Sequence, residues 1–263
     1  MTTVYYNGQE YQRQPLLTQT EGLLLATAAS SIIVSPLPYI GRSFQKQLNK
    51  EIPNNHIFKD SFLKAFDISG LKEKGVGVIE AQKSFVPLEY KLGQQACYDP
   101  FYKKVIINTD KISSAGFHEL GHALNDLKSK YGIKYLAKLR APGYVIAGIM
   151  EYFAIFSRTK PKEAKRNTTD IIEDNCGKIA FLAMMPTVIE EAIASLRGIN
   201  LAKKSGVPEP LIKNMKKIYL KAHTTYSAKA VLGGLAVFAS RKIMDYFTRP
   251  RPVENSSESF FFG

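Results

Sequence analysis

The feature that most constrains this chain is the pentapeptide His118-Glu119-Leu120-Gly121-His122, which reads H-E-x-x-H. Two histidines four residues apart project from the same face of a helix, where both imidazoles can reach one zinc ion. A carboxylate beside the first histidine can then take a proton from a water molecule bound to the metal. The pattern therefore predicts a helix with His118 and His122 as zinc ligands and Glu119 as the catalytic base.

The residues around this motif favour the zinc interpretation over a chance match. Every other residue between Phe117 and Leu124 is uncharged, as expected for a helix that passes through a protein interior. The preceding residues, Ser-Ser-Ala-Gly at 113–116, can cap the start of such a helix. The alternative is an ordinary helix that carries two partly buried histidines, and the small Gly121 between them argues against it.

The composition is that of a globular protein. Of the 263 residues, 45% are hydrophobic and 22% are charged, and this length fits one large domain or a domain with additions. The two cysteines, Cys97 and Cys176, do not have the spacing of a disulfide scaffold or of a cysteine zinc cluster. We therefore expect a reducing compartment.

The net charge of +13 arises in the body of the chain and not at its N-terminus. Residues 124–140 contain five Lys or Arg against Asp126, and residues 201–221 contain six Lys against Glu209. Such an excess suits either nucleic acid or an anionic membrane surface. Because the chain has no basic motif interleaved with aromatic residues of the RNA-recognition type, we expect no nucleic-acid partner.

Residues 22–40 carry no charge, and a segment of about 20 apolar residues can cross the hydrocarbon core of a membrane. Pro36 and Pro38 are expected to break the helix at its end. A secretory signal peptide is disfavoured because the positive n-region is missing, and a buried core helix is the remaining alternative. The basic residues from Arg42 onward favour a cytoplasmic location for the part of the chain that follows.

These patterns predict two parts, an N-terminal segment over residues 1–41 with the apolar helix as membrane anchor, and a membrane-associated catalytic domain over residues 42–263 that faces the cytoplasm. Short runs rich in β-branched residues at 76–80 and 104–108 predict strands. An apolar helical hairpin is expected over residues 141–189. The fold class is therefore mainly α with a small β-sheet. The strand at 104–108 precedes the motif helix, where it can bind substrate backbone as an edge strand or pair within the sheet.

A catalytic zinc site needs a third protein ligand and an open position for water. Residues 123–128 lack the x-x-G-x-x-H continuation of a three-histidine metzincin. The remaining candidates are Glu151, Glu190, Glu191 and His223. The acidic pair is the best case, because Ala192, Ala194 and Ser195 would let this segment approach the motif helix closely, and a carboxylate among apolar neighbours needs a cation. The alternative is an exposed acidic pair in the first turns of a helix, favoured by the helix dipole.

Several motifs occur in an order that resembles a known family. These are Cys97-Tyr-Asp-Pro-Phe101, the strand at 104–108, His-Glu-Leu-Gly-His-Ala at 118–123, the apolar hairpin and Glu191-Ala-Ile-Ala-Ser195. Over residues 95–240 the chain resembles the bacterial membrane zinc metallopeptidases, which are similar to the CAAX-prenyl endopeptidases and the heat-shock membrane proteases. In that family the third ligand begins an E-x-x-A-[SD] stretch, which implies Glu191 and not Glu190. Ile193 stands where an acidic residue is frequent, which weakens the expected support of a histidine ligand.

The resemblance implies a zinc-dependent endopeptidase of the gluzincin type with a zincin-like core. Zn²⁺ would be held by His118, His122 and Glu191, and Glu119 would act as the base. The substrate would be a peptide or a protein. The alternative is a catalytically inactive, membrane-associated protein that retains a zincin-like fold.

Some supporting roles stay open in the sequence. The candidates for stabilising an oxyanion are Arg197, His223 and Tyr226, and each of them also suits a surface or core position. Asn125 can support the metal site or lie on the helix surface. Asp126 can orient a ligand imidazole or pair with Lys130 one turn further on.

Overall fold

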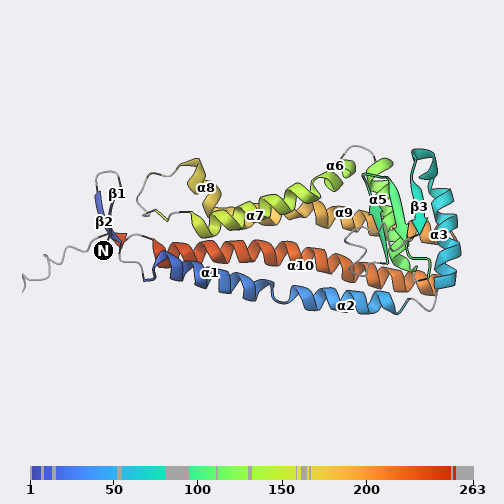
Figure 1. Cartoon of the computed structure of the whole chain (residues 1–263), viewed down its shortest axis with the longest axis horizontal. Coiled ribbons are helices and arrows are strands. Elements are labelled where there is room, and N and C mark those ends of the chain that lie inside the picture. The colour runs from blue at the N-terminus through green and yellow to red at the C-terminus, as the bar shows by residue number, and fades with distance from the viewer. Residues whose placement is uncertain are drawn as a thin grey trace, which may run out of the picture. The chain divides into compact units, whose positions relative to one another are not determined.

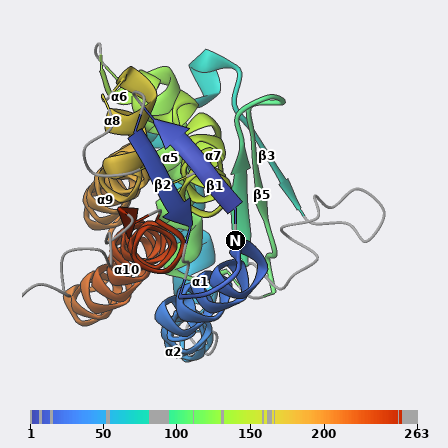
Figure 2. The same cartoon turned by 90° about the vertical axis from the view of Figure 1, so that its left-hand side faces the viewer.

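The structure is a computed structural model of the chain. It describes residues 2–6, 9–13, 16–51, 55–80, 95–110, 112–129, 132–157, 159–160, 165, 167–249 and 251–252. These residues form long helices and two small sheets, as Figures 1 and 2 show. The prediction of a mainly α-helical fold with a small β-sheet is therefore confirmed.

The chain divides into two compact units, each assembled from segments that are distant in the sequence. Unit 1 comprises Met1–Ser35, Tyr144–Ala183 and Val231–Gly263, and unit 2 comprises Pro36–Gly143 and Met184–Ala230. Three long helices contribute to both units, namely α7 (Arg140–Phe156), α9 (Cys176–Lys204) and α10 (Glu209–Thr248). The apolar arms of the predicted hairpin are helical and lie in α7 and α9. The domain boundary predicted after residue 41 stays a prediction.

Unit 2 contains a three-stranded sheet and the helices that pack on it. Its other helices are α2 (Leu37–Asn49), α3 (Asn55–Ser69), the single turn η2 (Lys72–Lys74), α5 (Ser114–Leu127) and α6 (Ile133–Lys138). Its strands are β3 (Gly77–Glu80), β4 (Ala96–Asp99) and β5 (Lys104–Ile107). The central strand is β5, which is parallel to β3 and antiparallel to β4. Both predicted strands are confirmed, and the second one pairs within the sheet on both of its sides, so that β4 is an edge strand.

The core of unit 2 anchors α5 between α3 and the sheet. Phe117 of α5 packs edge-on against Phe58 and Phe62 of α3, with ring centroids 6.3 and 6.0 Å away. All three rings are fully buried, and burying a side chain of this size contributes about 1.5–3 kcal/mol. On the sheet side, Val105 and Ile107 of β5 belong to the same core. The motif helix is therefore held on a rigid support.

Buried polar contacts determine where α5 begins. Ser113 is the N-cap, and its hydroxyl accepts a hydrogen bond from the Ala115 amide at 3.2 Å. The Ser114 amide donates to Glu51 Oε2 at 3.0 Å, and Asn214 Nδ2 donates to Glu51 Oε1 at 3.0 Å. The buried Glu51 carboxylate therefore lies at the positive end of the α5 dipole. The predicted cap within residues 113–116 is confirmed.

We expect the pH dependence of folding to report on Glu51. Burial raises the pKa of its carboxyl above the ordinary 4.5, although hydrogen bonds from Ser114 and Asn214 oppose the rise. The folded protein then holds this proton more tightly than the unfolded chain, so the group makes the folded state less stable as the pH rises from 4.5 through the folded pKa. Glu51→Gln removes this titration. In urea unfolding, the variant should gain stability relative to the unsubstituted protein as the pH rises through that window, and a constant or falling difference would contradict the expectation.

Unit 1 consists of helices with a small sheet of its own. α1 (Gln19–Val34) and α8 (Thr168–Asp174) join the unit 1 parts of α7, α9 and α10. The strands β1 (Thr2–Tyr6), β2 (Gln9–Arg13) and β6 (Arg251–Pro252) pair antiparallel in the order β1-β2-β6. α1 begins at a capping box formed by Thr18 and Glu21. It ends before Pro36, so the predicted helix break at the prolines is confirmed, although α2 begins directly afterwards at Leu37.

The interior of unit 1 combines small residues with a few larger ones such as Met150 and Val237, whereas many of its large apolar side chains are exposed. Ala154, Cys176 and Ala180 are buried together. Gly177 packs so closely that an added Cβ would lie 2.6 Å from Phe238 Cβ. The exposed large apolar residues include Leu24, Ile32, Val145, Ile146, Ile149, Tyr152, Phe156, Leu182, Val231, Leu235 and Tyr246. An exposed apolar surface of this extent is suited to contact with another apolar surface or with lipid.

Several charged side chains of unit 1 have hydrogen-bond or ion-pair partners inside the same unit. Glu151 of α7 accepts hydrogen bonds from the Ser30 hydroxyl at 3.2 Å and from the Ser240 hydroxyl at 3.1 Å. Arg241 of α10, which is 5% exposed, pairs with Glu173 of α8 at 3.0 Å. Glu151, a candidate third ligand in the sequence, thus has partners that tie three helices of unit 1 together, and its described contacts include neither histidine of the motif.

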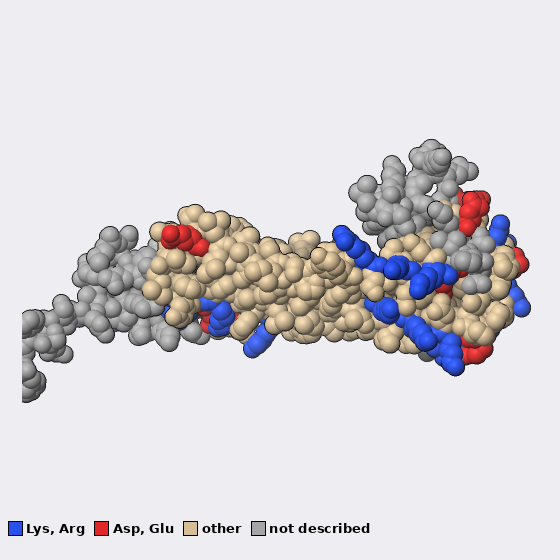
Figure 3. Space-filling view, turned by 90° about the horizontal axis from the view of Figure 1, so that it is seen from below, with Lys and Arg blue, Asp and Glu red and all other residues tan. Residues whose placement is uncertain are grey.

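Two helical segments are long and apolar enough to cross a membrane by length and composition. One is Gln19–Asn49, which covers α1 and α2 and includes the predicted apolar segment, and the other is Cys176–Lys204, which is α9. In Figure 3, a long stretch of the face shown carries almost no charged side chain, and Lys and Arg gather over another part of it. The exposed basic residues of α2, of its C-cap and of the unit 2 part of α10 are Arg42, Lys46, Lys50, Lys213, Lys216, Lys217, Lys221 and Lys229.

Candidate metal centre

Within unit 2, α5 and α9 bring two histidines and one carboxylate to a single point. His118 Nε2 lies 3.0 Å from His122 Nε2 and 3.0 Å from Glu191 Oε2. His122 Nε2 lies 3.6 Å from the same carboxylate oxygen. All three side chains are largely buried. The three residues expected from the sequence as ligands are therefore neighbours in the fold.

The two helices cross at a distance that glycine makes possible. A Cβ on Gly121 of α5 would lie 2.0 Å from the Ala194 carbonyl oxygen of α9. A Cβ on Gly198 of α9 would lie 2.7 Å from the Phe117 carbonyl oxygen of α5. Both neighbours are backbone atoms, which cannot yield unless a whole helix moves. The expectation that small residues after Glu191 permit a close approach is thus met at Ala194.

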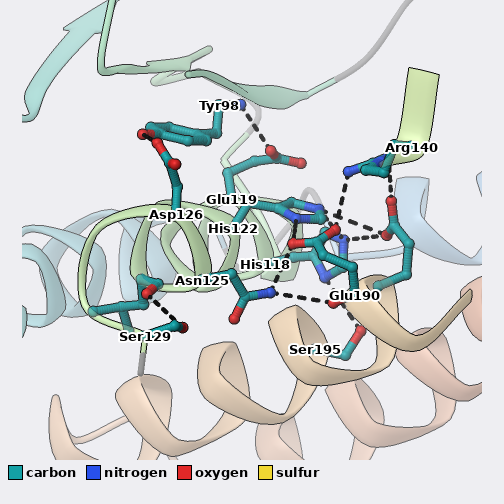
Figure 4. A network of polar contacts seen from close by, with 12 residues as sticks. Tyr98, His118, Glu119, His122, Asn125, Asp126, Ser129, Arg140, Glu190 and Ser195 are labelled. Atoms are coloured by element: carbon teal, nitrogen blue, oxygen red, sulfur yellow. Dashed lines mark hydrogen bonds and ion pairs between the residues drawn. The ribbon is translucent and has the colours of Figure 1, made fainter. Parts of the chain in front are cut away.

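Glu190 contacts the second ring nitrogen of His122, the one that is not turned toward Glu191 (Figure 4). Its Oε1 lies 2.8 Å from His122 Nδ1 and accepts a hydrogen bond from Asn125 Nδ2 at 2.7 Å. A carboxylate on the second nitrogen fixes the tautomer and the orientation of a metal-ligating histidine. Asn125 is fully buried, so of its two open roles the observed one is support of the site. The support that Ile193 cannot supply comes from Glu190.

His118 is supported from behind by residues of α9 and α10. Its Nδ1 lies 3.2 Å from the Ser195 hydroxyl. The Tyr219 ring lies 5.4 Å from the His118 ring, centroid to centroid, and the Tyr219 hydroxyl donates to the Ser114 carbonyl at 2.6 Å. Each imidazole therefore has a partner for its second nitrogen, and its Nε2 is turned toward Glu191.

Glu119 points from α5 toward the edge strand β4 (Figure 4). Its Oε2 accepts a hydrogen bond from the Tyr98 backbone amide at 2.7 Å. Burial raises the pKa of the Glu119 carboxyl, and the neighbouring His122 and His118 only partly oppose this rise. A carboxylate with a raised pKa is suited to accept a proton near neutral pH. Glu119, His118 and His122 each offer one potential ligand atom, and these three atoms lie within 4.8 Å of one another.

Of the two roles left open for Asp126, the described contacts do not include the orientation of a ligand imidazole. Its Oδ2 accepts a hydrogen bond from the Tyr98 hydroxyl at 2.9 Å, which ties α5 to β4. The other partner considered for it, Lys130, lies outside the described residues. The two ends of Tyr98 thus hold two residues of the motif helix, Glu119 through the backbone and Asp126 through the side chain.

Arg140, at the start of α7, completes the site, and no local motif marks it in the sequence. Its Nη2 donates to Glu191 Oε1 at 2.6 Å, and its Nη1 donates to Glu190 Oε2 at 3.1 Å. In the sequence, Arg140 could be identified only as one of five basic residues between 124 and 140. Its guanidinium bridges the two adjacent carboxylates in the structure, and its side chain remains 35% exposed.

The carboxylates make this a position that attracts cations. Burial disfavours the protonated form of His122, but Glu191 and Glu190 outweigh burial and hold the pKa of this imidazole well above its usual range. Burial, together with the neighbouring Glu191, raises the pKa of the Tyr226 hydroxyl well above its ordinary value. Tyr226 therefore stays a neutral hydrogen-bond donor beside the site. Among the three candidate oxyanion donors, Tyr226 is the one that contacts Glu191. The described contacts of His223 and Arg197 include none with the histidine pair or with Glu191.

The donor set fits a divalent metal ion. In a tetrahedral zinc site the ligand atoms lie about 2.0–2.2 Å from the ion, and hence about 3.3–3.6 Å from one another. The observed separations of the three atoms are 3.0, 3.0 and 3.6 Å, so two of the pairs are at hydrogen-bond distance and would open slightly around an ion. Two imidazole nitrogens and a carboxylate oxygen are also ligand types that zinc takes. These residues could therefore hold a metal ion, and Glu119 lies beside the position that such an ion would take.

Comparison with known proteins adds no relative. No protein-family model, curated protein or solved structure matches this chain.

Proposed function

We propose that this chain is a zinc-dependent endopeptidase with a zincin-like core. The observation that carries the proposal is the convergence of His118 Nε2, His122 Nε2 and Glu191 Oε2, with Glu119 directly beside them. The resemblance of the motif order to the membrane zinc metallopeptidases points to the same reaction. His118, His122 and Glu191 would hold the metal and leave one position open.

The proposed reaction is hydrolysis of a peptide bond. When bound, zinc would supply an acidified water molecule and polarise the carbonyl of the bond to be cleaved. Glu119 takes the proton released during attack and returns it to the leaving amine. Tyr226 is the neutral donor available to the negative charge that develops on the carbonyl oxygen.

The substrate would lie along β4 in an extended conformation. The Tyr98 amide donates to Glu119, so this edge of the strand is turned toward the base. A peptide that adds to a sheet edge gains main-chain hydrogen bonds without demanding a particular sequence. A carbonyl of such a peptide would compete with Glu119 for the Tyr98 amide and free the carboxylate for proton transfer.

Metal binding by purified protein tests the proposal. We expect one equivalent of zinc by elemental analysis, and Glu191→Ala should lose it because a first ligand is missing. Glu190→Ala, on the adjacent residue, is the matched control and should weaken zinc binding by only about 10–100-fold, as loss of an outer partner does. Purified protein that contains no zinc and gains no stability from added zinc would overturn the proposal.

We further infer that unit 1 associates with a membrane and that the catalytic part faces the cytoplasm. The support is the interior of small and hydrogen-bonded residues, the exposed large apolar side chains, and two helices of sufficient length. The basic residues that follow the first apolar segment favour the cytoplasmic side. Fractionation of cells without detergent tests this inference, and recovery of the protein in the soluble fraction would reject it without affecting the metal site.

A further inference from the structure

The acidic pair of α9 has four carboxylate oxygens, and the described contacts divide them among three kinds of partner. Glu190 Oε1 contacts His122 Nδ1 and Asn125, and Glu190 Oε2 accepts from Arg140. Glu191 Oε1 accepts from the same guanidinium. Only Glu191 Oε2 is turned to the Nε2 atoms of the histidine pair.

A second group of ligand-type atoms lies next to the proposed zinc position. His122, Glu190 and Glu191 each offer one atom within 4.8 Å of the others, and all three residues are buried. Arg140 contacts both carboxylates of this group, so a guanidinium already provides the positive charge that a second ion would otherwise bring. The fork of an Arg side chain matches such a pair, because its donors lie in one plane at fixed spacing.

We propose that Arg140 is a positioning residue that fixes the two carboxylates in different orientations. It holds Glu190 against His122 and leaves one oxygen of Glu191 for a single metal ion. This inference rests on the proposed zinc site, and it adds a prediction about the affinity and geometry of that site.

If Arg140 acted through its charge alone, its removal would change zinc affinity in the opposite direction. Arg140 is a positive group close to the position of a divalent cation, and like charges repel. If Arg140 acted only through its charge, its removal would strengthen zinc binding. If it positions the carboxylates, its removal weakens zinc binding by about 10–100-fold, the usual effect of losing an outer partner of a metal site.

Two variants separate position from charge. Arg140→Met removes both the charge and the two hydrogen bonds, while Arg140→Lys keeps the charge but lacks the planar fork. We expect both variants to lose affinity. Arg197→Met is the matched control, because Arg197 lies on α9 within the electrostatic reach of Glu190 without a described contact to either carboxylate. It should leave zinc affinity within about twofold of the unsubstituted protein, since its charge is partly screened by solvent and no described hydrogen bond joins it to either carboxylate.

The experiment uses the full chain stripped of metal. Zinc affinity is measured by competition with a chromophoric chelator, and the visible absorption of the Co²⁺-loaded protein reports ligand geometry. Both Arg140 variants should show weaker zinc binding and an altered Co²⁺ spectrum. Circular dichroism and thermal unfolding confirm that the variants are folded. As a second measurement, methylguanidinium but not methylammonium should restore zinc affinity to Arg140→Ala, because the partly exposed site admits the small cation.

The outcomes separate this inference from the proposed function. Zinc binding that is unchanged or tighter in Arg140→Met overturns the role of Arg140 and leaves the zinc site standing. An Arg140→Lys variant that behaves like the unsubstituted protein overturns positioning in favour of charge. Failure of the unsubstituted protein to bind zinc overturns both the proposed function and this inference.

Discussion

Glu119→Gln is expected to lower peptide hydrolysis by about 10²–10⁴-fold while zinc binding is retained. The amide has nearly the shape of the carboxylate, and its oxygen can still accept the hydrogen bond from the Tyr98 amide. It cannot take up a proton at neutral pH, so the step that Glu119 supports is lost. The measurement is kcat/KM for cleavage of a labelled unstructured protein such as casein, together with zinc content.

The control for this variant is Glu73→Gln, which makes the same change at an exposed position of η2 and should leave hydrolysis unaltered. An active Glu119→Gln variant would show that Glu119 is not the base. A variant without zinc would show that Glu119 is a ligand. If the unsubstituted protein binds zinc yet cleaves nothing, the inactive, membrane-associated alternative is the better description.

Gly121→Ala is expected to disrupt the metal site without changing any ligand. The added methyl group would meet the Ala194 carbonyl oxygen at 2.0 Å, so α5 and α9 must separate. Overpacking of this kind costs about 1–3 kcal/mol of stability. Separation also moves Glu191 away from the histidine pair, and the loss of one ligand contact should reduce zinc affinity at least as much as the loss of an outer partner, about 10–100-fold. Urea unfolding and chelator competition measure the two effects.

Gly148→Ala is the matched control for this prediction. Gly148 lies in α7, and an added Cβ would meet nothing within 4 Å. Because alanine is the better helix former, this variant should be neutral or more stable by up to about 1 kcal/mol. A Gly121→Ala variant as stable and as zinc-bound as Gly148→Ala would show that the close crossing of α5 and α9 is not required.

The motif helix could be predicted because its evidence is local. The spacing of His118 and His122 places both imidazoles on one face of any helix, whatever packs around it. The cap at residues 113–116 and the strands at 76–80 and 104–108 likewise follow from short stretches of sequence. These features survive in the structure because each depends on only a few neighbouring residues.

The acidic pair shows where local evidence ends. Consecutive helical residues point about 100° apart, so the residue pattern alone offers Glu190 and Glu191 equally. The crossing of α5 over α9 separates them, with one carboxylate at His122 Nδ1 and the other at the Nε2 atoms. The partner of Asp126 could not be read from the sequence for the same reason, because β4 brings the Tyr98 hydroxyl to it from another part of the chain.

The spacing of the two histidines, the position of Glu119 beside them and the helical character of the chain could therefore be predicted from the sequence, since helix periodicity acts over a single turn. The bridge from Arg140 to an acidic pair 50 residues away, and the glycine contacts that let α5 and α9 approach, arise only when the chain is packed. Such contacts depend on how segments that are distant in the sequence pack against one another. A pattern that repeats every three or four residues contains no information about this packing.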